Sequence, residues 1–197
     1  MLTESAGHLI LLMAPMGSGK NALKDAAKQA YPEIVFLVSC TTRTPRPGEV
    51  EGREYYFLSR DVFMEKVHAG EFVEWAEFGG NLYGTLKSEI LEPLEEGRVV
   101  LNEIELQGVE QLRALIPKEN RTVVYIEAGD WEALRERALK RAPMSDEELE
   151  KRHARYLIER ESKKIADVII ENYDGGLAAA QKAFVDLVGG VIERCKK

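Results

Sequence analysis

The sequence predicts an α/β fold, in which a mostly parallel β-sheet is covered by helices on both faces. Short apolar segments alternate with helix-like segments along the chain of 197 residues. Such alternation is typical of parallel sheets, because a helix must carry the chain back between two parallel strands. The apolar segments also lack the polar alternation of half-exposed strands, which indicates strands buried on both faces.

Five apolar segments of strand length supply the expected sheet. They comprise residues 8–13, 34–39, 98–104, 122–128 and 166–171. Between the strands, apolar side chains recur at the spacing of an amphipathic helix. The predicted helices are residues 20–31, 106–116, 131–138 and 177–192. We therefore expect a three-layer core built from these elements.

Residues 39–85 do not follow this alternation of strands and helices. They are rich in charged and aromatic side chains, with turn-forming residues such as Pro45 and Gly48. Residues 71–78 (EFVEWAEF) alternate as a short strand does. We interpret this region as an inserted, partly antiparallel lobe.

A second irregular segment, RAPMSDEELEKR, occupies residues 141–152. Pro143 would end the preceding helix, because proline lacks the N–H that the helix requires. Ser145 and Glu148 have the spacing of a capping box, which starts another helix. We expect this helix–break–helix arrangement to form a mobile flap.

These segments indicate a single domain over residues 1–197, a size at which one core is usual. We expect its parts to have the following approximate bounds. The core comprises residues 1–38, 86–136 and 166–197, the inserted lobe residues 39–85, and the helical lid residues 137–165.

Composition narrows the classes of function. A net charge of −7 argues against nucleic acid or an anionic membrane as the main partner. No apolar run approaches the ~18 residues of a membrane span, and the first such run lacks the basic residues that begin a signal peptide. Cys40 and Cys195 lie far apart, so we expect neither a zinc site nor a disulfide scaffold, and a reducing cytoplasm fits.

The segment APMGSGKN at residues 14–21 is similar to a phosphate-binding loop. Gly17 and Gly19 can adopt positive φ angles and turn backbone N–H groups inward. Lys20 would add its charge to the positive end of the following helix. Because the segment joins a predicted strand to a predicted helix, it has the context that this motif requires. The sequence thus predicts a P-loop NTPase-like core.

Two residues depart from the usual pattern G-x-x-x-x-G-K-[ST]. Ala14 replaces the first glycine, which a small residue with negative φ can do. Asn21 replaces the hydroxyl that ligates Mg²⁺ in nucleoside triphosphatases, and a neutral amide oxygen is a weaker ligand for this hard ion. We expect a working loop with altered metal affinity.

Residues of the inserted lobe suggest the phosphate acceptor. Arg43 and Arg46 could converge on one dianion, because a guanidinium binds phosphate in bidentate fashion. Period two places Glu74 on the side of its strand that carries Phe72, Ala76 and Phe78. A carboxylate on such an apolar face needs a donor. Guanine offers adjacent N1–H and N2–H₂ groups, whereas adenine offers no such pair.

Four motifs together resemble the guanylate kinases from about residue 8 to residue 190. The pattern S-x-T-T-R-x-P-R-x-G-E-x-x-G-x-x-Y-x-F is complete in residues 39–57. It is followed by GEFVEWA (70–76), NLYGT (81–85) and EIELQG (103–108). Glu105 stands where the family usually has aspartate, and Asn172 in IENYD matches a late asparagine of the family.

This resemblance implies transfer of the γ-phosphoryl group from ATP to GMP, with Mg²⁺ as cofactor. It also implies that residues 39–85 are the GMP-binding lobe and that a small helical lid closes over the phosphates. The residues it assigns to ATP are Ala14, Pro15, Met16, Gly17, Ser18, Gly19, Lys20, Asn21, Ala22 and Asn172. Those assigned to GMP are Ser39, Arg43, Arg46, Tyr55, Glu74, Tyr83, Thr85, Glu103 and Glu105.

For catalysis, the resemblance implies Lys20 and the lid residues Arg137, Arg141 and Arg152. The metal would be held mainly by phosphates and water, with Asn21 and Glu103 as possible contacts through water. Both a monomer and a homodimer are compatible with the sequence.

Two other functions remain open at this stage. One is a non-catalytic protein-binding module, since guanylate kinase-like domains of scaffolding proteins bind phosphopeptides at the GMP lobe. Lys20 and the lid arginines argue against it, because such modules typically have degraded ATP loops. The other is a related kinase with another small phosphorylated acceptor, against which Glu74, Tyr83 and Thr85 argue.

Overall fold

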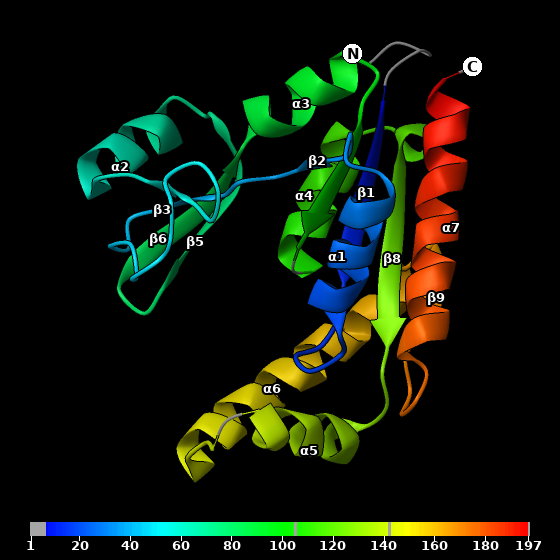
Figure 1. Cartoon of the computed structure of the whole chain (residues 1–197). Helices are drawn as coiled ribbons and strands as arrows, with labels where there is room; N and C mark the ends of the chain where they lie inside the picture. Colours follow the sequence, from blue (N-terminus) through cyan, green and yellow to red (C-terminus); the bar gives the residue numbers. More distant parts are fainter. Residues whose placement is uncertain (1–6, 105, 142, 197) are drawn as a thin grey trace.

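The computed structural model describes residues 7–104, 106–141 and 143–196, and its centre is a parallel five-stranded sheet. The strands lie in the order β2-β7-β1-β8-β9 (Figure 1). Their bounds are β1 His8–Met13, β2 Val35–Phe36, β7 Val99–Glu103, β8 Arg121–Glu127 and β9 Val168–Glu171. All four strand pairs of this sheet are parallel, as the sequence predicts.

Helices cover both faces of this sheet. Helices α1 (Lys20–Ala30) and α7 (Leu177–Cys195) pack on the face that carries Ile10 and Leu12 of β1. Helices α3 (Lys87–Glu95) and α4 (Leu106–Leu115) pack on the opposite face. Strand β1 is buried at every position, because it lies in the middle of the sheet between two layers of helices.

The two edge strands depart from the prediction of strands buried on both faces. Strand β9 is partly exposed, and the second predicted strand is wrong in both length and burial. Only Val35 and Phe36 of residues 34–39 form a strand, and both are partly exposed. The reason is that β2 is an edge strand with β7 as its single neighbour, after which the chain leaves for a second sheet. Two further helices were not predicted, namely α3 and α2 (Arg60–His68).

The second sheet has four short strands in the order β4-β3-β6-β5. Their bounds are β3 Cys40–Thr41, β4 Tyr56–Phe57, β5 Phe72–Phe78 and β6 Asn81–Leu86. Strand β6 pairs antiparallel with both β3 and β5, whereas β3 and β4 are parallel. Helix α2 packs on this sheet through Phe63, whose ring stacks on Phe72 at 4.4 Å between centroids. Figure 1 shows the resulting lobe to one side of the core.

Helices α5 (Trp131–Arg141) and α6 (Asp146–Glu161) form a separate pair beyond the carboxyl end of β8 (Figure 1). The Ser145 side chain accepts a hydrogen bond from the N–H of Glu148 at 3.2 Å, so this part of the predicted cap is confirmed. Short 3₁₀ helices lie at Lys118–Asn120 and Ser162–Ile165. Within the described ranges, no helix is long and apolar enough to cross a membrane.

Candidate active site

The predicted phosphate-binding loop connects β1 to α1 at the carboxyl edge of the central sheet. Gly17 and Gly19 have φ angles of 79° and 90°, which only glycine adopts at little cost. A Cβ on Gly19 would lie 2.5 Å from the side-chain nitrogen of Asn172. Because Gly19 begins α1 without a capping side chain, the first N–H groups of this helix can bind an anion.

Asn172, which follows strand β9, holds this loop through a hydrogen bond. Its buried side chain donates a hydrogen bond to the carbonyl oxygen of Ser18 at 2.7 Å. Its own N–H donates to the carbonyl of Glu127, which joins the end of β9 to that of β8. Asn172 therefore fixes the shape of the loop, and does so at a distance of 154 residues along the chain.

Lys20 and Glu103 meet beside the loop. The Lys20 ammonium group donates to the carbonyl of Ala14 at 2.8 Å and lies 3.3 Å from a Glu103 oxygen. The other Glu103 oxygen lies 3.0 Å from the Lys24 ammonium group. Burial raises the pKa of Glu103, but attraction to Lys20 and Lys24 outweighs it, so the pKa lies below its usual range.

On the acceptor side, Glu49 holds the two predicted phosphate-binding arginines. The Arg43 guanidinium donates to both Glu49 oxygens at 2.9 and 3.0 Å. The N–H of Arg46 donates to Glu49 at 2.7 Å. The Arg43 guanidinium also lies 5.5 Å from the ring centroid of Tyr55, which packs edge-on against Tyr83. The Arg43 guanidinium thus lies between Glu49 and the Tyr55 ring, and Glu49 also accepts from the Arg46 backbone.

Glu74 and Thr85 face each other on the neighbouring strands β5 and β6. The Thr85 hydroxyl donates to Glu74 at 2.8 Å and lies 3.5 Å from the Ser39 hydroxyl. The prediction that Glu74 shares the face of Phe72 is wrong, because a β-bulge shifts the register between these two residues. Phe72 pairs with Leu86 and Glu74 with Thr85, and adjacent partners point to opposite faces.

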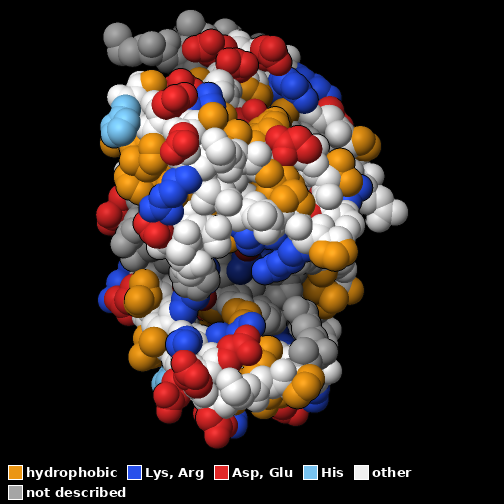
Figure 2. All heavy atoms as spheres, turned by 90° about the vertical axis from the view of Figure 1, so that its left-hand side faces the viewer, with side chains coloured by type: hydrophobic (Ala, Val, Ile, Leu, Met, Phe, Trp, Pro, Cys, Tyr) orange, Lys and Arg blue, Asp and Glu red, His pale blue; other side chains and the backbone are white. Residues whose placement is uncertain are grey.

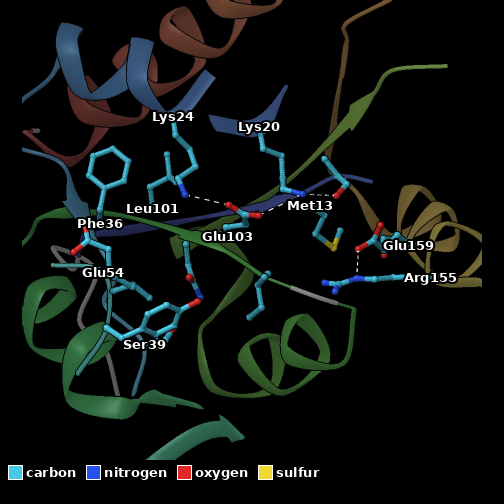
Figure 3. Close-up of a pocket in the computed structure, with 16 residues that line it drawn as sticks. Met13, Lys20, Lys24, Phe36, Ser39, Glu54, Leu101, Glu103, Arg155 and Glu159 are labelled. Carbon is cyan, nitrogen blue, oxygen red and sulfur yellow. Dashed lines mark hydrogen bonds and ion pairs between the residues drawn. The ribbon is translucent and has the colours of Figure 1, made fainter. Parts of the chain in front are cut away.

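Two cavities meet at this site. One, of about 340 Å³, extends from Lys20 towards Ser39 and Tyr55, and the other, of about 890 Å³, follows the phosphate loop and helix α6. Both are lined by Lys20, Glu103, Arg155 and Glu159. Figure 2 shows lysine and arginine side chains gathered around a hollow on this face, and Figure 3 shows the lining of the smaller cavity.

Comparison with known proteins identifies the family. A guanylate kinase family model matches residues 6–182. The chain belongs to the guanylate kinase family. The guanylate kinase of Trichormus variabilis is 41% identical over 94% of this chain and 92% of its own length. The guanylate kinase of Rubrobacter xylanophilus is 41% identical over 85% of this chain and 87% of its own length. The guanylate kinase of a Synechococcus species is 48% identical over 61% of this chain and 66% of its own length.

A solved guanylate kinase has the same fold. The crystal structure of the enzyme from Anaplasma phagocytophilum superposes with a TM-score of 0.67 at 26% identity, covering 94% of this chain and 86% of that one. The resemblance found in the sequence is therefore confirmed, together with the α/β class and its mostly parallel sheet.

Two arginines of the predicted lid are bound to acidic residues. The Arg137 guanidinium donates to Asp174 at 2.7 and 2.9 Å and to the carbonyl of Asn172 at 3.1 Å. Arg152 donates to Glu148 at 2.5 and 3.0 Å and also contacts the sulfur of Met16. Glu148 therefore binds Arg152 instead of completing the capping box. The side chain of Arg141 and all of Glu105 lie outside the described residues.

Several residues that line the cavities were not among the predicted site residues. Charged examples are Lys24, Arg155 and Glu159. Arg155 follows Arg152 by three positions and donates to Glu159 at 2.8 Å. Helical spacing from Lys20 and from Arg152 could have indicated Lys24 and Arg155 respectively. Whether these turns face the site depends on where α1 and α6 lie, which their own sequences do not state.

The donor set fits a metal that arrives with ATP. No cluster of three or more His, Cys, Asp or Glu side chains that could cage a metal ion occurs in the described part of the chain. Asn21 and Glu103 line the larger cavity, and Glu103 is already paired with two lysines. Mg²⁺ usually keeps several waters and uses few protein ligands when phosphates are present, so these residues are compatible with water-mediated contacts.

Proposed function

We propose that this member of the guanylate kinase family transfers the γ-phosphoryl group of ATP to GMP, and to dGMP, with ADP and the nucleoside diphosphate as products. The observation that carries this proposal is the shared lining of the two cavities. Lys20 and Glu103 belong to both, so a donor on the phosphate loop and an acceptor near Ser39 would meet beside Lys20. Phosphoryl transfer requires mainly such positioning and neutralisation of charge.

On the donor side, residues 14–22 would bind the ATP phosphates through backbone N–H groups. The positive φ angles of Gly17 and Gly19 and the start of α1 support this role. Lys20 would leave Glu103 and bind the oxygens of the departing γ-phosphoryl group. Asn172 would act by holding the loop in shape through Ser18.

On the acceptor side, the Arg43 guanidinium would exchange Glu49 for the GMP phosphate, and the Arg46 guanidinium would bind the same phosphate. The exchange is favourable, since a phosphate dianion is a stronger partner for guanidinium than a single carboxylate. Ser39, Tyr55 and Tyr83 would add hydroxyl groups. Glu74 would accept from the N1–H and N2–H₂ of guanine, and Thr85, already bonded to Glu74, would orient it.

The lid would complete the site. Arg137, Arg141 and Arg152 would move from their partners on the protein to the ATP phosphates and the transferring group. Closure would exclude water, which otherwise competes for the phosphoryl group. The chain needs no general base, because the GMP phosphate is already an anionic nucleophile. Glu103 and Glu105 would contact guanine, the lid arginines or the hydration shell of the metal.

Mg²⁺, bound with ATP, would neutralise charge on the phosphate oxygens. Asn21 and Glu103 are the residues that would contact its waters. We further propose that the reaction serves purine nucleotide metabolism in the cytoplasm. The cysteines Cys40 and Cys195 support that location, because neither forms a disulfide within the described residues.

A coupled assay of ADP formation tests this function. The purified chain is supplied with ATP, Mg²⁺ and one of GMP, dGMP, AMP, CMP or UMP, and the nucleotide products are separated. We expect turnover with GMP and dGMP and little with the other three, because only guanine presents adjacent donors to Glu74. Equal turnover with AMP would contradict the assignment of Glu74. A chain inactive with every acceptor would indicate a binding module.

A further inference from the structure

Lys24 lies one turn of α1 beyond Lys20 and shares its partner. The Lys24 ammonium group is 3.0 Å from one Glu103 oxygen, and the Lys20 ammonium group is 3.3 Å from the other. A single carboxylate thus bridges two lysines of one helix (Figure 3). The Lys24 side chain is 29% exposed and lines the smaller cavity, whereas the larger cavity does not include it.

The function proposed above, on which this inference rests, creates a problem for Glu103. When Lys20 turns towards the ATP phosphates, Glu103 loses one of its two partners. If Lys24 were absent, the Glu103 carboxylate, whose side chain is 38% exposed, would then have neither lysine as a partner. Glu103 also lines both cavities, so an unpaired carboxylate there would repel the phosphates of both substrates.

We propose that Lys24 is a positioning residue that holds Glu103 when Lys20 binds the donor phosphates. Two lysines and one carboxylate carry a net charge of +1 beside the junction of the cavities. After Lys20 has turned to phosphate, Lys24 still neutralises Glu103 and keeps its side chain in place. Lys24 thereby makes the ammonium group of Lys20 available for catalysis without itself touching a substrate.

The next lysine of the same helix provides a comparison. Lys28 follows Lys24 by one more turn and is exposed. Its ammonium group lies 5.4 Å from the ring centroid of Phe36, and Lys28 lines neither cavity. Lys28 is therefore a lysine of the same helix that does not line the cavities, and it serves as the matched control.

The first experiment measures kcat and KM for ATP and GMP in three variants. Lys24→Met should lower kcat by roughly tenfold, the scale of one hydrogen bond to a charged group, with a smaller change in KM for GMP. Lys24→Arg should keep most of the parental kcat, because arginine supplies the same charge. Lys28→Met should match the parent. Thermal unfolding checks that each variant is folded. If Lys24→Met is not folded, Lys24→Gln replaces it in the kinetic measurements.

A double-mutant cycle tests whether Lys24 acts through Glu103. If it does, Lys24→Met should change kcat much less in a Glu103→Gln background than in the parent, because the amide does not need a cation. An equal loss in both backgrounds would overturn the proposal. So would a Lys24→Met variant with the kinetics of the parent.

A titration of the Glu103 carboxyl group by NMR gives a readout that needs no turnover. The pKa of Glu103 should be higher in Lys24→Met than in the parent, since an attractive charge has been removed, and unchanged in Lys28→Met. An unchanged pKa in Lys24→Met would overturn the proposal. If the parent forms no GDP from GMP and ATP, the proposed function fails, and this outcome is distinct from an active parent that Lys24→Met leaves unaltered.

Discussion

The phosphate loop and the acceptor lobe are built in different ways. The loop is shaped by backbone, with glycines at positive φ and a buried asparagine that holds the Ser18 carbonyl. The acceptor lobe depends on side chains, among them the Arg43–Glu49 pair and the Thr85–Glu74 hydrogen bond. A site made of backbone groups tolerates changes of side chain, whereas a site made of side chains does not.

This difference accounts for the two departures of the loop from the usual motif; the third departure, Glu105, belongs to neither the loop nor the lobe. Ala14 and Asn21 change side chains of the loop. The groups expected to bind phosphate there are backbone N–H groups, which these changes leave in place. In the lobe, each position of the long motif from Ser39 to Phe57 is kept. The four predictions below test this contrast, in order of expected effect.

Lys20 is the one side chain of the loop on which we expect catalysis to depend. Lys20→Ala should lower kcat by roughly 10²–10³-fold, the usual loss when a charge-stabilising donor is removed. GMP affinity, measured by calorimetry without ATP, should hardly change. A variant that keeps most of the parental rate would show that the backbone alone suffices at the donor site.

Glu74 should be the most sensitive side chain of the acceptor lobe. Glu74→Ala should lower kcat/KM for GMP by about 10- to 100-fold, because truncation leaves buried hydrogen-bonding groups unpaired at about 1–3 kcal/mol. Steady-state kinetics with GMP measure the loss. Glu77→Ala is the control, since Glu77 lies on the same strand and pairs with the exposed Arg60. Parental kinetics in Glu74→Ala would remove Glu74 from guanine recognition.

Asn172 tests the backbone support of the loop. Asn172→Ala leaves the Ser18 carbonyl without its donor and should cost about 1–3 kcal/mol of stability. For a chain of this size the unfolding midpoint should fall by roughly 2–4 °C per kcal/mol. The KM for ATP should rise, as the loop loosens. Asn120→Ala, which removes a buried bond to the Gly7 carbonyl away from both cavities, should leave that KM unchanged, and an equal effect of both variants would contradict the specific role of Asn172.

Asn21 should have the smallest effect. Asn21→Ser restores the usual hydroxyl and should lower the Mg²⁺ concentration for half-maximal rate by a few-fold, or roughly 1 kcal/mol for one contact. A Mg²⁺ titration of GDP formation at fixed ATP and GMP measures this shift. Activity that appears only in Asn21→Ser would show that the parent is a binding protein on a kinase fold.

The sequence by itself determined the fold class and the family. Strands buried on both faces need continuous apolar runs, so β1, β7 and β8 were visible as such. The apolar run of β9 revealed the strand but not its partial exposure at the edge of the sheet. The start of α6 was visible because Ser145 caps it locally. The family could be recognised because each of its motifs consists of residues that are close in sequence. The spacing of such residues can be read from the sequence without knowledge of the fold.

Tertiary structure decided what depends on contacts between distant segments. The β-bulge beside Glu74 arises from pairing with β6, so period two within β5 could not reveal it. The short β2 follows from its place at the edge of the sheet. Lys24 meets Glu103 across 79 residues, and Arg155 reaches both cavities because α6 lies over the loop. Such positions depend on the packing of whole elements, which no local pattern specifies.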